Sequence, residues 1–185
     1  HKNLIHVSIH AGVGAGIILD HHLYTGLTGT AGEAGHMIVQ PGGRSCPCGN
    51  HGCLEQYISE PAVLSRYREL SGRTTVSIDD LVWAYNQKET AALAVMDEFT
   101  TYLACGINNL WNLFSPECII LNCQLTAYLP QLLPEILQKL SPRFRATCHL
   151  KLSTLQDTGV LLGAAKVCIS KYLGTEKLYF SGLQP

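Results

Sequence analysis

The chain has 185 residues, of which 46% are hydrophobic and 15% are charged, and its formal net charge is -1. This composition argues against a disordered chain and favours a single globular domain with a sizeable core. The 13 Lys and Arg residues are scattered without a dense run, which argues against nucleic-acid contact by this segment itself. Its apolar runs are shorter than a membrane span and no signal peptide opens it, so we expect no membrane insertion.

The first forty residues predict mainly β structure. Apolar patterns predict strands at 4–9, 17–19 and 23–24, joined by glycine-rich or polar turns. A further short strand is predicted at 37–39, after a stretch rich in Gly and Thr at 25–32. The chain enters its first strand almost at once and has no initiator Met, so we expect it to be a piece of a longer polypeptide.

Helical patterns dominate the middle of the chain. Ser59, Glu60 and Pro61 form a helix start, and this helix is predicted to end near Gly72. A capping pattern at 77–80 begins a second helix. The most regular helix is predicted over 89–114, where apolar residues recur every three or four positions. Its apolar face fits either the core or a dimer interface.

The last third alternates strand and helix. The fully apolar run 118–121 is typical of a strand in a buried parallel sheet. A helix at 132–140, a strand at 148–152 and a helix at 159–173 with a small-residue face are predicted to follow. This order indicates one α/β domain.

Three cysteines and a histidine have the spacing of a metal site. Cys46, Cys48 and Cys53, together with His36, could supply three thiolates and one imidazole, a set typical of structural zinc. A disulfide or free thiols are the alternatives. The five other cysteines of the eight lie in apolar surroundings typical of core residues in a reducing compartment, so we expect a cytoplasmic protein.

A carboxylate lies next to each part of this motif. Glu33 precedes His36 by three residues, and Glu55 follows Cys53 by two. Carboxylates fixed beside an ordered loop suit recognition of a polyhydroxylated ligand. The alternatives are a helix-start carboxylate for Glu33 and, for Glu55, a charge that favours the positive end of the next helix. His51 is interpreted as a solvated loop residue.

These motifs resemble those of the ROK family, which contains bacterial sugar kinases and sugar-responsive transcriptional repressors. The resemblance covers nearly the whole chain and rests on these segments: the glycine-rich hairpin 12–20, the sugar-site motif 30–36, the cysteine loop 46–55, the Asn-Leu-x-x-Pro segment 112–117 and the closing helix 159–165. It implies the C-terminal lobe of an actin-like, ribonuclease-H-like ATPase-type α/β fold, with a mixed sheet flanked by helices. The whole of 1–185 would form this one lobe.

The resemblance also implies roles for individual residues. The zinc ligands would be His36, Cys46, Cys48 and Cys53, and the sugar contacts would be Glu33, His36 and Glu55. Zinc held by three thiolates has no open position, so its expected role is to order the sugar-binding loop rather than to take part in chemistry.

Departures from the kinase motifs favour the NagC/Mlc/XylR-like repressor branch. His10-Ala11-Gly12 stands where the kinases have Gly-Thr-Gly, so Gly12, Gly14 and Gly16 are interpreted as a degenerate phosphate loop. Asn122 and Cys123 stand where the kinases have a Gly-Gly pair. We therefore expect the effector-binding and oligomerisation part of a sugar-responsive repressor without catalytic residues. A fragment of an ATP-dependent ROK sugar kinase is the alternative.

The repressor interpretation implies several partners. The inducer would be a sugar or a sugar phosphate, or a protein partner would take its place. DNA would be bound through a winged helix-turn-helix that, like the N-terminal lobe, lies outside this sequence. We expect a homodimer or homotetramer in which the ligand shifts a two-state equilibrium.

Overall fold

The computed structural model describes residues 1–155 and 158–174. By their internal contacts these residues divide into two compact units, His1–Ser153 and a second one that begins at Thr154. The first unit holds the sheet and all of the predicted site residues. The second contains the final helix α8 (Thr158–Leu173), which confirms the helix predicted there.

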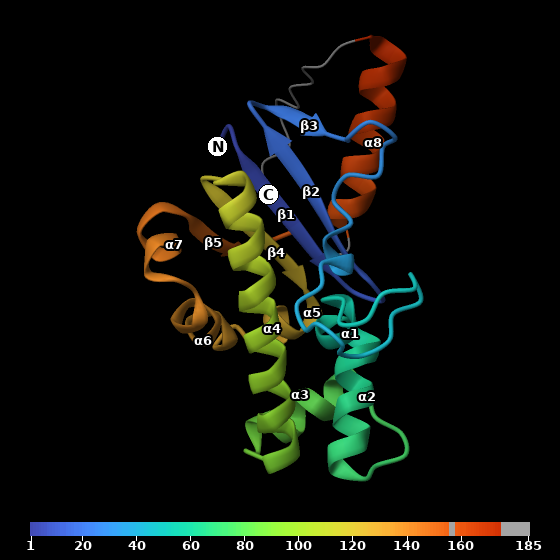
Figure 1. Cartoon of the computed structure of the whole chain (residues 1–185), viewed down its shortest axis with the longest axis vertical. Helices are drawn as coiled ribbons and strands as arrows, with labels where there is room; N and C mark the ends of the chain where they lie inside the picture. The colour runs from blue at the N-terminus through green and yellow to red at the C-terminus, as the bar shows by residue number, and fades with distance from the viewer. Residues whose placement is uncertain (156–157, 175–185) are drawn as a thin grey trace. The chain divides into compact units, whose positions relative to one another are not determined.

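The first unit is built on a five-stranded mixed sheet with the order β3-β2-β1-β4-β5 (Figure 1). Its strands are β1 (Leu4–Ile9), β2 (Val13–Leu19), β3 (His22–Tyr24), β4 (Cys118–Cys123) and β5 (His149–Leu152). The central strand β1 pairs antiparallel with β2 and parallel with β4. The parallel partner β4 comes more than a hundred residues after β1, so the helical middle of the chain forms the crossover between them.

Alternation along β1 separates a core face from a polar face. Ile5, Val7 and Ile9 are at most 2% exposed. Successive side chains of a strand point to opposite faces, so His6 and Ser8 lie on the other face of the sheet. Because β1 is flanked on both sides, this alternation places a polar strip along the middle of the sheet.

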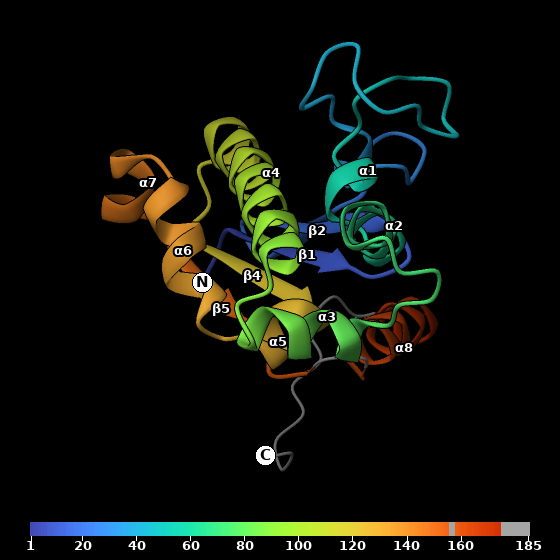
Figure 2. The ribbon, with the colours of Figure 1, turned by 90° about the horizontal axis from the view of Figure 1, so that it is seen from below.

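The described part of the first unit has seven α-helices, four between β3 and β4 and three between β4 and β5. Their bounds are α1 (Glu55–Ile58), α2 (Glu60–Ser71), α3 (Ile78–Asn86), α4 (Thr90–Phe114), α5 (Gln124–Tyr128), α6 (Leu132–Lys139) and α7 (Pro142–Thr147). The long helix α4 lies between α6 and α2 and contacts both (Figures 1 and 2). Its apolar stripe is buried in the core, as the periodicity predicts. None of the described helices is long and apolar enough to cross a membrane.

The helix ends follow local sequence rules. Ser77 caps α3, since its hydroxyl accepts from the Asp80 N–H at 3.1 Å while the Asp80 carboxylate accepts from the Ser77 N–H at 2.8 Å. Gly72 ends α2 in the left-handed conformation, with φ of 70°. The capping pattern and the predicted helix end are thereby confirmed.

Two predictions of secondary structure need correction, and two short helices were missed. Residues 37–39 form no strand of the sheet: the segment has an isolated bridge between Ile38 and Cys53, and its backbone hydrogen bonds go to Ala34, Gly52 and Leu54. The strand predicted at 17–19 begins earlier, at Val13, so Gly14 and Gly16 lie within β2 rather than in a turn. The short helices α5 and α7 were not predicted, since neither is long enough to show helical periodicity.

Candidate functional site

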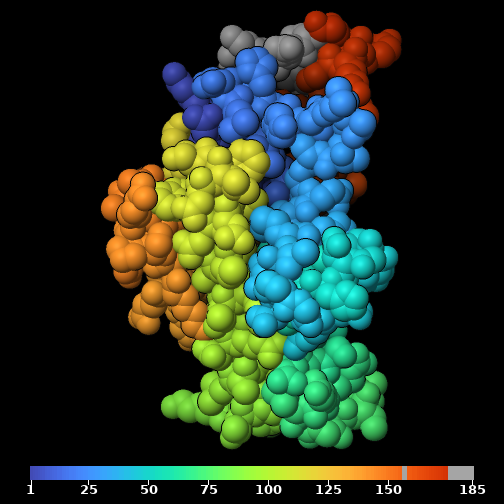
Figure 3. All heavy atoms as spheres, in the orientation of Figure 1, coloured from blue at the N-terminus to red at the C-terminus, as the bar shows by residue number. Residues whose placement is uncertain are grey.

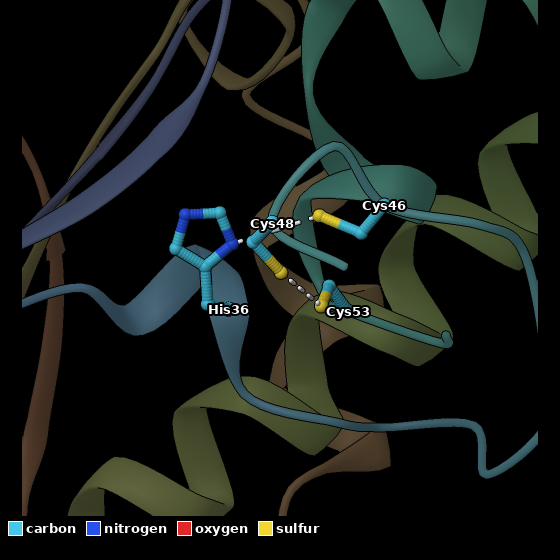
Figure 4. A group of neighbouring side chains, drawn as sticks. All are labelled: His36, Cys46, Cys48 and Cys53. Carbon is cyan, nitrogen blue, oxygen red and sulfur yellow. Dashed lines mark hydrogen bonds between the residues drawn. The ribbon is translucent and has the colours of Figure 1, made fainter. Parts of the chain in front are cut away.

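Four side chains bring one metal-binding atom each to a common point (Figure 4). The ligand atoms of His36, Cys46, Cys48 and Cys53 all lie within 4.8 Å of one another. The Sγ atoms of Cys48 and Cys53 are 3.7 Å apart, and Cys46 Sγ lies 3.6 Å from His36 Nδ1. Tetrahedral zinc with Zn–S bonds of ~2.3 Å separates its sulfurs by about 3.8 Å. The arrangement therefore fits a tetrahedral metal ion.

The cysteine loop owes its shape to tight turns that require glycine. The N–H of Gly49 donates to the Cys46 carbonyl at 3.0 Å, and the N–H of Gly52 donates to the Arg44 carbonyl at 2.7 Å. Gly52 has φ of +83°, and a Cβ there would stand 1.7 Å from the Gln40 carbonyl oxygen. An L side chain can satisfy neither condition, so glycine at this position closes the loop.

The sheet fixes the segment that carries His36. That residue ends a short 3-10 helix (Ala34–His36) packed against β2. A Cβ on Gly32 would lie 1.9 Å from the Ala15 carbonyl oxygen, and one on Gly35 would lie 2.4 Å from that of Val13. The two backbones thus meet without room for a side chain, which sets the position of the imidazole relative to the sheet. Figure 3 shows the surface that this segment and the cysteine loop form beside α4.

The clustered thiols of the cysteine loop have pKa values that are shifted in opposite directions. Burial, together with hydrogen bonds that the thiol donates to Cys46 and Cys48, raises the pKa of the Cys53 thiol to about 12. In contrast, a hydrogen bond with the Asn50 backbone is the main cause that lowers the pKa of Cys48. Thiolates are the metal-binding form of cysteine, and a divalent ion supplies the positive charge that lets neighbouring thiols ionise together.

His36 has a carboxylate near each ring nitrogen. Its Nδ1 faces Cys46 and lies 3.7 Å from Glu55 Oε1, whereas its Nε2 lies 3.8 Å from Glu33 Oε2. The Glu55 side chain is 18% exposed and accepts a hydrogen bond from Cys46 Sγ at 3.2 Å. The Glu33 side chain is 67% exposed. The structure thus brings all three predicted sugar-binding residues together, with Glu33 facing solvent.

Arg44 joins the cysteine loop to two helices, a role that sequence reasoning missed. Its Nη1 donates to the Gln56 carbonyl at 2.8 Å, and its guanidinium lies 4.5 Å from the centre of the Tyr57 ring. Its Nη2 pairs with Glu98 of α4, which also accepts from Arg66 Nε at 3.0 Å. The one available signal was that Glu98 and its neighbour Asp97 are the only charged residues between positions 91 and 116.

A polar cluster of His10, Glu60 and Asn122 lies at the start of the predicted phosphate loop. His10 Nδ1 lies 3.5 Å from Glu60 Oε1, and Asn122 Nδ2 lies 3.3 Å from His10 Nε2. The His10 N–H already donates to the Gly12 carbonyl at 2.9 Å, so that amide is not free for an anion. Glu60 Oε1 is buried without a hydrogen-bond partner among the described residues. Of the three predicted glycines, Gly12 alone stays in the turn, and its Cβ would meet Glu55 Oε2 at 3.8 Å.

Comparison with known proteins gives consistent matches along the chain. The profile of the ROK family matches residues 1–171. The xylose repressor of Bacillus spizizenii is 33% identical over 182 residues, which cover 96% of this chain and 47% of that protein. A glucokinase of Halalkalibacterium halodurans is 30% identical over 181 residues, covering 88% of this chain and 55% of that enzyme.

A solved structure described as a ROK family transcriptional regulator, homolog of the E. coli MLC protein, has a TM-score of 0.77 and 30% identity. The matched region covers 95% of this chain and 48% of the regulator's chain. The likeness confirms the predicted actin-like α/β fold. The chain spans about half the length of the curated relatives it matches, at 47% and 46% of two xylose repressors from Bacillus.

Proposed function

This chain belongs to the ROK family, and we propose that it is the sugar-sensing, oligomer-forming C-terminal lobe of a transcriptional repressor. The observation that carries the proposal is the placement of Glu33, His36 and Glu55 around one point beside the cysteine loop. The similarity to a xylose repressor and to an MLC-like regulator supports the same choice within the family.

The metal of this lobe is structural zinc, held by His36, Cys46, Cys48 and Cys53. The spacing of the four donor atoms and the thiolate-rich set support this assignment. When bound, the ion supplies charge compensation and a fixed geometry and no open coordination position. The loop residues then keep Glu55 and the His36 ring in place.

The sugar hydroxyls are bound by carboxylates and an imidazole. Glu33 and Glu55 accept hydrogen bonds from the hydroxyls, and charged acceptors make these bonds strong. His36 turns Nδ1 to the cysteines and so leaves Nε2 for the ligand. Since the curated relatives include xylose repressors and a glucokinase, D-xylose and D-glucose are the first ligands to test.

Regulation follows from differential binding. The sugar, or a sugar phosphate, binds one arrangement of the two lobes more tightly and shifts the population towards it. In a cytoplasmic homodimer or homotetramer this rearrangement changes the spacing of the paired N-terminal DNA-binding domains relative to the operator half-sites. A protein partner that prefers the same arrangement acts by the same rule.

The polar cluster at the phosphate loop favours regulation over phosphoryl transfer. Transfer from ATP needs backbone amides and space at the phosphates. Here the His10 amide is already bonded and the His10 ring stands between Glu60 and Asn122. A ROK sugar kinase remains the second candidate, because a glucokinase is among the relatives.

Two measurements test this proposal. Calorimetric titration of the full-length gene product with D-xylose and D-glucose should show binding that Glu33→Gln and Glu55→Gln weaken, and that the exposed control Glu69→Gln does not. Incubation with ATP and either sugar should produce no ADP above background. Sugar-dependent ADP formation would establish the kinase and end the repressor proposal. Reading the gene upstream of His1 gives an independent check, since a helix-turn-helix is expected there.

A further inference from the structure

Positive charge gathers in one segment of a chain that is nearly neutral. Residues 136–155 contain four Lys or Arg and no Asp or Glu. Lys139 pairs with Asp97, and Arg143 lies 5.7 Å from the centre of the Trp111 ring. Neither Arg145 nor Lys151 forms an ion pair with any residue in the described part of the chain. Within the part of the chain that the structure describes, the segment therefore carries positive charge that no ion pair compensates at Arg145 and Lys151.

Lys151 lies on β5 and Arg145 on the helix α7 just before it, and β5 is an edge strand of the sheet formed by the described residues. β5 is an outer strand in the order β3-β2-β1-β4-β5. The His149 N–H donates to the Glu117 carbonyl, on the side of β4. In a parallel ladder the bonding side alternates, so the N–H groups of Leu150 and Leu152 point to the outer side. Neither donates to an acceptor among residues 1–155 and 158–174.

A groove of about 330 Å³ runs beside this edge. It is lined by Leu137, Arg145, Cys148, His149, Leu150 and Lys151. The lining combines the cations of Arg145 and Lys151 and an imidazole with aliphatic side chains, and no carboxylate is among these described lining residues. An exposed strand edge of this kind is a template for pairing with another chain.

We propose that the edge of β5 docks an extended acidic segment of a partner protein by strand addition. The backbone of the segment takes up the outward amides of Leu150 and Leu152. Its alternate side chains then meet two different surfaces. Acidic residues face His149 and Lys151, and apolar residues face the two leucines, as cross-strand neighbours do.

The alternation of acidic and apolar side chains distinguishes this partner from other anionic ligands. Inorganic phosphate satisfies the cations without using the strand edge. Duplex DNA requires a longer array of cations than Arg145 and Lys151 provide. Only an extended acidic peptide uses the cations, the aliphatic lining and the free amides together.

The first test uses two short peptides on the full-length protein. Fluorescein-labelled acetyl-Glu-Val-Glu-Val-Glu-Val-amide should bind in anisotropy titrations, with affinity that falls as salt rises. The Gln-Val peptide of equal length should bind at least about tenfold more weakly, because it lacks the charge. Equal binding of the two peptides would overturn the proposal.

Charge-reversal variants test whether the acidic peptide binds at the β5 edge. Arg145→Glu combined with Lys151→Glu should weaken the acidic peptide at least about tenfold. The charge-matched control Arg68→Glu with Lys88→Glu changes two exposed cations elsewhere and should leave binding unchanged. Unaltered binding to the first variant would refute the site. Displacement of the peptide by inorganic phosphate or by a short DNA duplex at matched ionic strength would assign the surface to those ligands instead.

Amide hydrogen exchange tests the strand addition itself. The peptide should slow exchange at Leu150 and Leu152, which point outward, more than at Val160 in α8. Unchanged exchange at both leucines in the saturated complex would show that the peptide binds without pairing, and would overturn the proposal. This readout needs no altered side chain, so it stands even if the charge variants fold poorly.

Discussion

Alanine at Gly52 should open the cysteine loop, whereas alanine at Gly49 should only strain it. Both glycines lie between Cys48 and Cys53 and both are left-handed, with φ of +83° and +95°. That conformation costs an L residue about 1–2 kcal/mol. At Gly49 this is the whole cost, because a Cβ there would meet no atom within 4 Å.

At Gly52 the Cβ would also stand 1.7 Å from a backbone oxygen, that of Gln40. A backbone atom cannot rotate away, so the loop has to separate from residues 39–40. That movement breaks the two hydrogen bonds that the Gly52 carbonyl accepts from the N–H groups of Val39 and Gln40. Two lost hydrogen bonds at about 1 kcal/mol each raise the expected total to about 3–4 kcal/mol.

The assay is urea unfolding with and without EDTA, together with zinc analysis after gel filtration. Gly49→Ala should keep about one zinc per chain and lose about 1–2 kcal/mol of unfolding free energy. Gly52→Ala should lose most of its zinc, and EDTA should then change its stability little. If the two variants held equal zinc and were equally stable, the steric argument for Gly52 would be refuted.

Three further changes test other parts of the first unit. Cys48→Ser should reduce the zinc content well below one per chain and bring the stability down to that of the EDTA-treated protein; full zinc in this variant would contradict the assignment. Glu98→Gln should lower the unfolding free energy by about 1–2 kcal/mol, more than Asp97→Asn does, because the Glu98 side chain is 23% exposed and that of Asp97 is 76% exposed. Burial, and then the nearby His10, lowers the pKa of His6 below its usual 6.5. The neutral His6 ring therefore costs no stability above pH 6.5, whereas below that pH the unfolded chain takes up a proton more readily and the folded state loses stability. His6→Gln should flatten the acid side of a plot of unfolding free energy against pH, and an unchanged plot would contradict the lowered pKa of His6.

Much of the fold was predictable because the signals were local. The apolar run of β4 and the long periodic stripe of α4 report burial directly, residue by residue. A strand was wrongly predicted at 37–39 because its apolar residues pack against a loop rather than a sheet. The sequence alone does not show that the segment pairs with Cys53 through an isolated bridge. The short helices α5 and α7 depend on tertiary contacts more than on their own pattern.

The candidate site was likewise predictable only where its residues are close in sequence. The spacing of His36 and the cysteines indicated a common point, and the structure brings these side chains together. The pair formed by Arg44 and Glu98 joins residues 54 positions apart, so no spacing rule could have found it. Likewise, the sequence marked His10 and Asn122 as departures from a kinase motif but gave no sign that Glu60 would join them.

The cysteine loop and its neighbouring residues hold α4 at two points. Glu98 pairs with Arg44, and Gly106 lies so close to Leu54 that a Cβ there would stand 2.6 Å from the leucine Cδ2. The two points are about 12 Å apart along the helix axis. Two contacts separated along the axis fix both the position of α4 and its direction relative to the loop. Because the helix has 25 residues and is about 37 Å long, any tilt of the loop that it followed would displace its distant end by more than the loop itself.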